Sequence, residues 1–308
     1  MSTARAVRLD QYGGIEVLHV EEVELRALGP DEVVLEVRAA GINPGEAAIR
    51  QGFLAEVAPS TFPSGQGSDL AGVVTAVGGA GTGFAVGDEV LGYSWNRDSH
   101  ASAAVVPASQ LVAKPAGLPW PVAGSLYVVG ATAWAAVAAV EPQEGETVVV
   151  SAAAGGVGSL AVQLLRRRGV RVVGIASERN ADWLRSQGVD PVAYGDGLAD
   201  RVRAVAPDGV DALIDLHGPE YVDLALELGV APARIDSAIS FARAAEVGAK
   251  TEASIAGTSR EVLTELAALA ASGDLVVDVA ATYPLEQVRD AFAELETGHT
   301  RGKIVLVP

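Results

Sequence analysis

Residues 151–180 read "SAAAGGVGSLAVQLLRRRGVRVVGIASERN" and combine a run of small residues, an amphipathic segment and a second apolar run. Apolar side chains in the middle segment recur at helical spacing, which predicts one buried helix face made of Val157, Leu160, Ala161, Leu164 and Leu165. This helix would have Gly155, Gly156 and Gly158 in the preceding turn and in its first turn. Free N–H groups and the helix dipole favour an anion there, so the stretch predicts a phosphate site.

The glycine turn also has the spacing of a dinucleotide-binding motif. Ala152, Gly155 and Gly158 give the pattern AxxGxxG between two strand-like runs. Glycine in such a turn can serve packing alone, but the flanking strands and helix favour nucleotide binding. We therefore expect the pyrophosphate of a dinucleotide to lie against a group of four consecutive residues, Ala154, Gly155, Gly156 and Val157.

The end of the second strand distinguishes NADP from NAD, because an acid there binds a ribose hydroxyl but repels a 2′-phosphate. The strand is followed by Ser177, Glu178 and Arg179. Ser177 can donate to a phosphate and Arg179 can pair with it, whereas Glu178 argues for NAD if it faces the ribose. Arg179 could also be an ordinary first-turn helix residue, although a cation is poorly placed there. We favour NADPH as the cofactor.

The composition narrows the classes of partner. The 308 residues carry a net charge of −17, with 49% hydrophobic and 20% charged residues, which predicts a folded two-domain chain that does not bind nucleic acid. No apolar run is long enough to cross a membrane, and the first residues lack a signal-peptide core, so we expect a cytoplasmic protein without membrane contact. The chain has no cysteine and four scattered histidines, so we expect no metal.

The two parts of the chain differ in their patterns. The first third contains strand-like runs separated by glycines, which predict a β-rich unit. The stretch "KPAGLPWPVAG" (114–124) has three prolines, which we expect to interrupt regular structure and mark a domain boundary. Apolar runs then alternate with helical patterns, which predicts an α/β fold with a doubly wound parallel sheet. Residues 259–273 predict a helix capped by Ser259 and ended by Gly273, and the tail "GKIVLVP" predicts a strand that returns to the first domain.

Five motifs follow one another along the chain: "GINPGEAAIRQG" (41–52), "FPSGQGSDLAGVVTAVGGAGTGFAVGDEVLGY" (62–93), "VGATAWAAV" (129–137), "AAAGGVG" (152–158) and "GKIVLVP" (302–308). In this order they resemble the zinc-independent medium-chain dehydrogenases/reductases of the quinone oxidoreductase type. The resemblance implies a GroES-like domain of residues 1–118 and 274–308 and a Rossmann domain of residues 119–273. It also implies bound NADPH, no zinc, and a homodimer formed through edge strands of the nucleotide domains.

The resemblance assigns cofactor roles to further residues, each with a structural alternative. Asn43 stands in the loop where zinc-dependent relatives have a cysteine, and it would lie near the nicotinamide as a cofactor-binding and candidate catalytic residue; alternatively, it is a turn residue before Pro44. Thr132 would lie near the nicotinamide ribose and phosphates, or bond a preceding carbonyl in its helix. Tyr194 would pack beside the adenosine 2′-phosphate, or cover the edge of the core. His217 and Ser237 would follow strands that the cofactor crosses, or simply form loops. Lys303 would approach the cofactor from the other domain, or begin a surface strand.

The acceptor site departs from the pattern of this family. Many such quinone reductases have a tyrosine two residues before the arginine of the "NPIDTYIRSG"-like motif, and here Ala48 holds that position, with Glu46 where an aspartate is frequent. Tyr93 or Tyr127 could replace the missing proton donor, although each could also be a half-buried aromatic. We predict that residues 53–63 line or cover the acceptor pocket, with Phe53 pointing inward, and that Trp95 is a second pocket residue.

Hydride transfer needs a dry cleft, correct orientation and stabilisation of charge on the acceptor oxygen, with a proton from water or one side chain. The leading hypothesis is an NADPH-dependent reductase of quinones or activated carbon–carbon double bonds, with a small apolar carbonyl or quinone as substrate. A dedicated enoyl or enone reductase of a biosynthetic pathway is the alternative among enzymes. A protein that binds NADPH without turnover is the alternative outside enzymes.

Overall fold

The computed structural model describes residues 3–254 and 259–308, which form two units. Unit 1 consists of the described residues up to Val128 together with Leu263–Pro308, and unit 2 consists of the described residues of Val129–Val262. The first unit is therefore discontinuous in sequence, with the second inserted into it. The divisions fall at Val128 and Leu263, whereas the sequence analysis placed them after residues 118 and 273.

Unit 2 is built on a parallel five-stranded sheet with the order β11-β10-β9-β12-β13. In order along the chain these strands are the third, second, first, fourth and fifth of the unit. This matches the first five positions of the strand order 3-2-1-4-5-6 of a doubly wound dinucleotide-binding sheet. Its strands are β9 (Thr147–Val150), β10 (Arg171–Ala176), β11 (Asp190–Ala193), β12 (Ala212–Asp215) and β13 (Ile235–Ser237).

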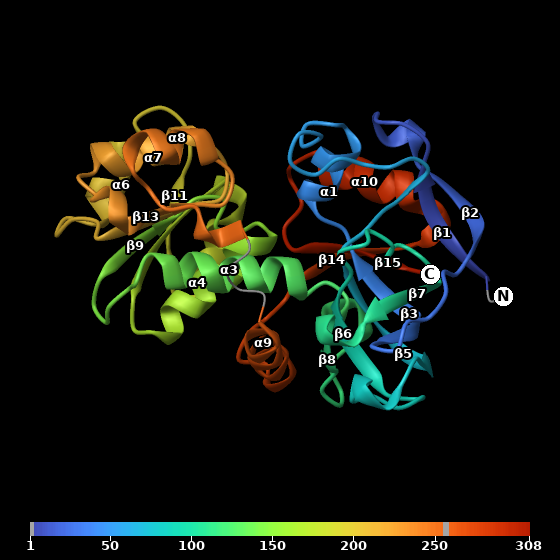
Figure 1. The fold of residues 1–308 in the computed structure, drawn as a ribbon. Coiled ribbons are helices and arrows are strands. Elements are labelled where there is room, and N and C mark those ends of the chain that lie inside the picture. The colour runs from blue at the N-terminus through green and yellow to red at the C-terminus, as the bar shows by residue number, and fades with distance from the viewer. Residues whose placement is uncertain (1–2, 255–258) are drawn as a thin grey trace. The chain divides into compact units, whose positions relative to one another are not determined.

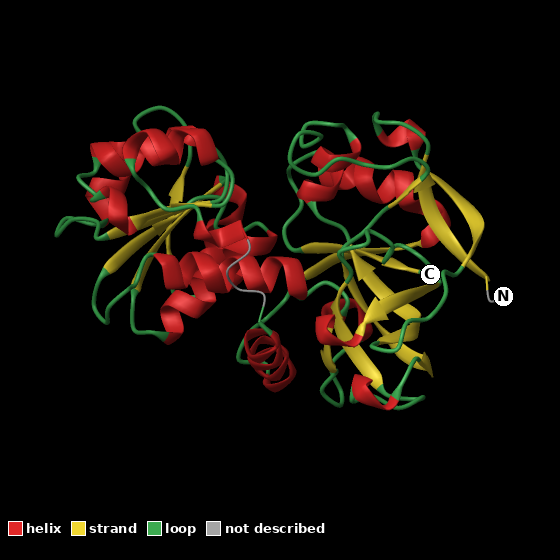
Figure 2. Ribbon diagram, in the orientation of Figure 1, coloured by secondary structure: helices red, strands yellow, loops and turns green. Residues whose placement is uncertain are grey.

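Helices cover both faces of this sheet, as the ribbon shows (Figures 1 and 2). On one face, α6 and α7 contribute Val202 and Leu224 to a core with Val149 and Val173 of the strands. On the other, α4 packs against β9 and β10. The helices are α4 (Gly156–Arg167), α5 (Ala181–Ser186), α6 (Leu198–Val205), α7 (Pro219–Glu227) and α8 (Phe241–Val247). The predicted alternation of buried strands and helices is confirmed.

Unit 1 is β-rich and holds two sheets. The larger has the order β14-β15-β3-β5-β6-β8, with β7 also paired to β3, and the smaller has the order β2-β1-β4. The strands are β1 (Thr3–Leu9), β2 (His19–Glu24), β3 (Glu32–Gly41), β4 (Ser64–Gly65), β5 (Asp69–Val77), β6 (Glu89–Tyr93), β7 (Ala103–Pro107), β8 (Leu111–Ala113), β14 (Val279–Pro284) and β15 (Lys303–Val307).

The C-terminal strand completes the larger sheet. β15 pairs in parallel with β14 and antiparallel with β3, where Val305 lies opposite Gly41. The helix α10 (Val288–Glu296) packs on it and contributes Phe292 to a core that also contains Leu9 and Ile42. The predicted return of the tail to the first domain is therefore confirmed, because both ends of the chain share one core.

Three further helices were only partly anticipated. Helix α1 (Pro44–Arg50) follows β3, and α9 (Arg260–Ser272) has the predicted ends, since Ser259 Oγ accepts the Val262 N–H at 3.2 Å and Gly273 has φ 81°.

The proline stretch contains a helix, α2 (Trp120–Ala123), so the expectation of no regular element there is wrong. Proline is tolerated in the first turn of a helix, where no intrahelical N–H bond is lost. Because α2 packs on β3 and β5, unit 1 extends beyond residue 118.

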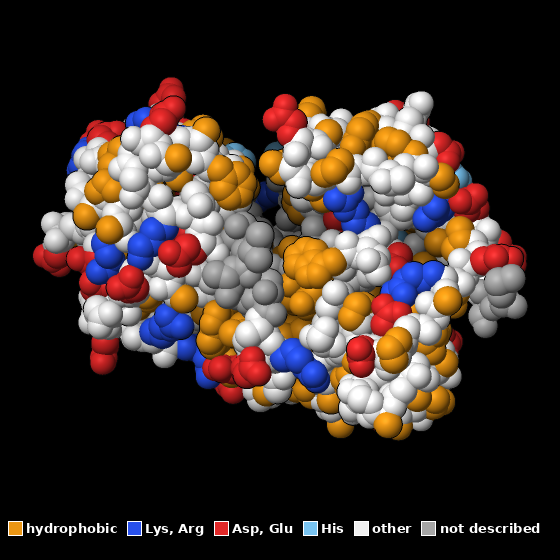
Figure 3. Space-filling view, viewed as in Figure 1, with side chains coloured by type: hydrophobic (Ala, Val, Ile, Leu, Met, Phe, Trp, Pro, Cys, Tyr) orange, Lys and Arg blue, Asp and Glu red, His pale blue; other side chains and the backbone are white. Residues whose placement is uncertain are grey.

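On the face shown in Figure 3, acidic and basic side chains are interspersed over each unit, with apolar side chains between them. None of the described helices is long and apolar enough to cross a membrane.

Candidate functional site

The predicted phosphate turn connects β9 to α4. Gly155 is the N-cap of α4 and has no side chain to bond the N–H groups of the first turn, so these remain directed at whatever lies before the helix. The turn is tightly closed, since Gly155 N donates to Ala152 O at 2.8 Å and Ala152 adopts a φ of 45°. A Cβ at Gly158 would lie 2.2 Å from Ala152 O, so this position requires glycine. The arrangement suits a phosphate group.

The residues predicted to select NADP lie at the carboxyl ends of two adjacent strands. Ala176 of β10 pairs with Ala193 of β11, so the next residues, Ser177 and Tyr194, emerge side by side. Tyr194 is 54% exposed, which is more than expected of an aromatic that seals the core. Arg179 is exposed in the short turn that follows Ser177. The structure thus brings these three predicted residues to one edge of the sheet.

A buried carboxylate that the sequence analysis missed organises the other half of this edge. Asp215, the last residue of β12, accepts hydrogen bonds from the Ser151, Ser237 and Ser240 hydroxyls at 3.1, 2.6 and 2.8 Å. Its Oδ1 also accepts the His217 and Gly218 N–H groups. It therefore ties together the segments that follow β9, β12 and β13. An acid at the end of the apolar run "DALID" is the signal that could have identified it.

These contacts bear on the cofactor roles predicted for Ser237 and His217. The Ser237 hydroxyl is fully buried and directed to Asp215, so its side chain has a structural function in unit 2. His217 is exposed, with its ring 5.7 Å from the Tyr221 ring. Thr132 is half-buried in α3 (Tyr127–Ala139). The cofactor roles of all three remain predictions.

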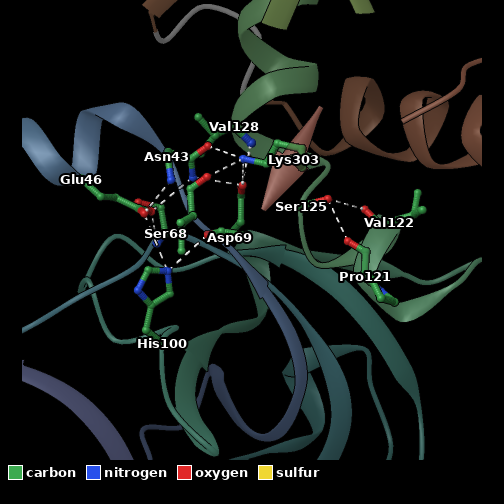
Figure 4. Close-up of polar contacts among 12 residues, drawn as sticks. Asn43, Glu46, Ser68, Asp69, His100, Pro121, Val122, Ser125, Val128 and Lys303 are labelled. Carbon is green, nitrogen blue, oxygen red and sulfur yellow. Dashed lines mark hydrogen bonds and ion pairs between the residues drawn. The ribbon is translucent and has the colours of Figure 1, made fainter. Parts of the chain in front are cut away.

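In unit 1, Asn43 and Lys303 are in direct contact, although 260 residues separate them in the chain. Lys303 Nζ donates to Asn43 Oδ1 at 2.5 Å (Figure 4). It also donates to Ile42 O at 2.9 Å. It also lies 3.5 Å from Asp69 Oδ2. Lys303 is only 4% exposed, so the alternative of a surface lysine is wrong. The pairing of β15 with β3 brings these residues together.

Two buried carboxylates complete this cluster, and the sequence analysis assigned a role to neither. Asp69 Oδ2 accepts from Asn43 Nδ2 at 3.1 Å, and Asp69 Oδ1 accepts the Val128 N–H at 2.7 Å (Figure 4). Glu46 Oε1 accepts from Asn43 Nδ2 at 3.2 Å and from Ser68 N at 2.8 Å. Burial raises the pKa of Asp69, which the Lys303 ammonium partly opposes.

His100 is packed beside these charged groups. Its Nε2 lies 3.2 Å from Gly41 O and 3.7 Å from Glu46 Oε2, while its ring lies 6.0 Å from that of Phe292. Burial lowers the pKa of His100, so the neutral form with the proton on Nε2 best fits the Gly41 carbonyl. Lys303 is therefore the residue that supplies positive charge to this cluster.

Three of the four aromatic residues predicted near the acceptor form one group, which we call the aromatic cluster: Tyr93, Trp95 and Tyr127. The rings of Tyr93 and Tyr127 are stacked with centroids 3.9 Å apart, and Trp95 meets the Tyr93 ring edge-on at 5.2 Å. Trp95 is 56% exposed, whereas Tyr127 is buried. Tyr93 lies opposite Asp69 in the pairing of β5 with β6, so the aromatic cluster adjoins the charged one.

The segment predicted to cover the acceptor pocket is irregular, but its first side chain points outward. Phe53 is 79% exposed, so the predicted inward orientation is wrong. The base of the segment is fixed because Arg97 donates to the carbonyls of Ala58 and Pro59 and Tyr12 accepts from Ser60 N. Phe53 itself follows shortly after the end of α1 at Arg50. Within α1, Ala48 is half-buried. The pocket roles of both residues remain predictions.

The described residues offer no cluster of three histidine, aspartate or glutamate side chains that could hold a metal ion. Asn43, in the loop where the family resemblance implies a cysteine in zinc-dependent relatives, bonds Lys303 and two carboxylates through its side chain. These residues do not fit a zinc site, and the absence of zinc from the protein remains a prediction.

A β-rich unit joined to a unit with a parallel dinucleotide-type sheet is typical of dehydrogenases and reductases. Two family models match: residues 29–144 match the alcohol dehydrogenase GroES-like domain, and residues 187–306 match a domain described as zinc-binding dehydrogenase. The chain therefore belongs to the medium-chain dehydrogenase/reductase family, in its quinone oxidoreductase group.

Individual relatives are similar to this chain over nearly its whole length. A quinone oxidoreductase of Pseudomonas aeruginosa is 30% identical over 99% of this chain and 100% of its own. The chloroplastic NADPH-dependent alkenal/one oxidoreductase of Arabidopsis thaliana is also 30% identical, over 96% of this chain and 78% of its own. The Escherichia coli quinone oxidoreductase, solved in complex with NADPH, is 27% identical and superposes with a TM-score of 0.87 over all of both chains.

Proposed function

We propose that this protein is an NADPH-dependent, metal-independent oxidoreductase that reduces quinones or α,β-unsaturated carbonyl compounds. The observation that carries the proposal is the glycine turn before α4, which combines an uncapped helix N-terminus with a position that excludes any side chain. The NADPH complex of the Escherichia coli relative supports the choice of cofactor.

The residues present fit a dinucleotide. The turn at Ala154–Val157 would hold the pyrophosphate, and Ser177, Arg179 and Tyr194 would hold the adenosine 2′-phosphate at the ends of β10 and β11. Bound NADPH supplies a hydride. The protein itself needs to orient the nicotinamide and the acceptor and to exclude water.

The aromatic cluster supports a flat, conjugated acceptor. Trp95 presents a partly exposed ring that is held edge-on by the Tyr93–Tyr127 stack, and a planar quinone or enone could lie against such a surface. A hydroxyl of this cluster, or water, would deliver the proton, since Ala48 leaves no phenol at the position used in many relatives. The name of the Arabidopsis relative favours the unsaturated carbonyl as a second substrate class.

The proposal is tested by following the absorbance of NADPH with a quinone, with an enone and without acceptor. We expect oxidation that depends on the acceptor. Trp95→Ala should lower kcat/KM for the acceptor without changing the Kd of NADPH, because on this proposal the ring contacts the acceptor and not the cofactor. Binding of NADPH without oxidation for either acceptor would contradict the enzyme and favour a non-catalytic NADPH-binding protein. Activity confined to enones would identify a dedicated enone reductase.

A further inference from the structure

The turn that follows β11 in unit 2 carries Tyr194, which the proposed function places beside the adenosine 2′-phosphate. The side chain of Tyr194 is 54% exposed, so core packing holds little of it. The backbone bends sharply after it, because Gly195 has a φ of 113° and Gly197 has a φ of 72°, values that favour glycine. An exposed ring on such a turn contributes to specific binding only where its backbone is held in place beforehand.

Arg201 of α6, a helix that packs on β11, supplies this support. Its Nη2 donates to Ala193 O and to Gly195 O, both at 2.9 Å, and these carbonyls belong to the residues on either side of Tyr194. Its Nε donates to Ala193 O at 3.1 Å, and its Nη1 donates to Asp196 O at 2.5 Å. The turn therefore closes around one guanidinium, whose planar fork fixes the directions of three carbonyls at once.

The main chain of Tyr194 is also tied to the neighbouring strand. Its N–H donates to the carbonyl oxygen of Ala176, the last residue of β10, at 3.4 Å. Ser177 and Arg179, the other two residues predicted to bind the 2′-phosphate, follow directly after this strand. Arg201 and Ala176 thus hold the backbone of Tyr194 from two sides, next to these two residues.

We infer that Arg201 is a positioning residue that holds Tyr194 in the orientation needed to bind the adenosine 2′-phosphate, and that it thereby contributes to a preference for NADPH over NADH. The inference rests on the proposed use of NADPH. Arg201 acts through the main chain on both sides of Tyr194 and not by its own contact with the phosphate. The Tyr194 hydroxyl can then donate to a phosphate oxygen without the entropic cost of ordering a mobile turn.

The test measures the Kd of NADPH and of NADH, whose ratio gives the preference between them. Arg201→Met releases the three carbonyls, so the preference should fall roughly three- to thirtyfold, chiefly through weaker binding of NADPH. Arg201→Lys keeps the charge but lacks the planar fork, so the preference should fall about as far. A preference that stays within about twofold of the wild type in either variant overturns the inference.

Arg203→Met is the matched control for the loss of positive charge. Arg203 lies two residues further along α6, where it pairs with the carboxylates of Asp200 and Glu227. Its replacement removes the same charge from the same helix without touching the turn, so the preference should change by less than about twofold. A fall as large as that of Arg201→Met would mean that charge alone sets the preference, which also overturns the inference.

A double variant tests whether Arg201 acts through Tyr194. In the background of Tyr194→Ala, the change Arg201→Met should cost clearly less preference than it does in the wild type, because the side chain that Arg201 positions is already absent. Equal losses in the two backgrounds would show that Arg201 and Tyr194 act independently, contrary to the inference.

Adenosine 2′,5′-bisphosphate and 5′-AMP separate a failure of this inference from a failure of the proposed function, because they occupy only the adenosine half of the site. A wild type that binds neither NADPH nor the bisphosphate refutes the proposed function itself. A wild type that prefers the bisphosphate to 5′-AMP, together with an Arg201→Met variant that keeps this preference, refutes only the role of Arg201. A general loss of folding would weaken 5′-AMP as well, and Arg201→Lys then provides the decisive measurement.

Discussion

Arg179 lies on an exposed turn directly after β10, beside Ser177 and close to the end of β11. If the adenosine 2′-phosphate binds there, Arg179→Ala should weaken NADPH by roughly 1.5 to 3 kcal/mol, the value of a charge-assisted hydrogen bond, and leave NADH almost unchanged. Titration of both cofactors measures the difference. Arg185→Ala is the matched control, since Arg185 pairs with Asp182 on the next helix. Equal losses for NADPH and NADH would refute the assignment of Ser177 and Arg179.

Asp236 in β13 is a buried carboxylate whose ionisation should oppose folding. Its Oδ1 accepts the Glu252 N–H at 2.7 Å, while its Oδ2 has no hydrogen-bond partner among the described residues. Burial raises the pKa of Asp236 to about 6. The folded protein therefore keeps a proton between about pH 4 and pH 6 that the unfolded chain has lost, so stability falls as the pH rises through this window.

Asp236→Asn should remove this pH dependence. Relative to the wild type, the variant should gain about 1 to 3 kcal/mol in free energy of unfolding when the pH is raised from about 4 to about 7. Urea denaturation at both pH values measures the gain, and Asp182→Asn, at a fully exposed side chain, is the control. A constant difference between variant and wild type would show that Asp236 titrates normally.

At the scale of elements, the turn between β9 and α4 depends on the glycine at residue 158. Gly158→Ala would place a Cβ 2.2 Å from Ala152 O and 2.8 Å from Ala153 Cα, so either the turn or the helix must shift. We expect a loss of at least about 2 kcal/mol in stability, or a loss of NADPH binding where the turn yields instead. Thermal denaturation and NADPH titration measure these effects.

Gly45→Ala in α1 provides the comparison for this prediction. A Cβ at Gly45 meets nothing within 4 Å, so the variant should be neutral or gain up to about 1 kcal/mol from helix propensity. Similar behaviour of the two variants would mean that the turn tolerates a side chain at residue 158. The cofactor role of the turn would then lose its main support.

At the scale of elements, local patterns predicted the strands and helices of unit 2 well. The runs "TVVV" and "VRVVGIA" form buried strands of unit 2. Ser259 and Gly273 also bound α9, which crosses from unit 2 into unit 1, as expected, because these signals act between residues close in the chain. The proline stretch was misread, since Trp120 and Pro121 begin a helix whose packing on β3 and β5 has no local signal.

For the whole molecule, the family resemblance led us to expect a homodimer, and charge should control its stability. A chain with a net charge of −17 repels its copy, and salt screens this repulsion. We predict that light scattering gives twice the chain mass of 31.4 kDa at physiological salt and a falling mass on dilution at low ionic strength. A mass of one chain under all these conditions would contradict the dimer.

The sequence alone predicted the fold class, the glycine turn between β9 and α4 and the position of Ser177 and Arg179 after β10, because glycine spacing and apolar periodicity are local properties. Only the tertiary structure brought Lys303 to Asn43, joined Asp215 to three segments and stacked Tyr93 on Tyr127. It also turned Phe53 outward. These contacts join residues far apart in the chain, and the pairing of β15 with β3 and the order of the parallel strands decide them. No local sequence pattern predicts that the buried amide of Asn43 will face the carboxylate of Asp69, which lies on another strand.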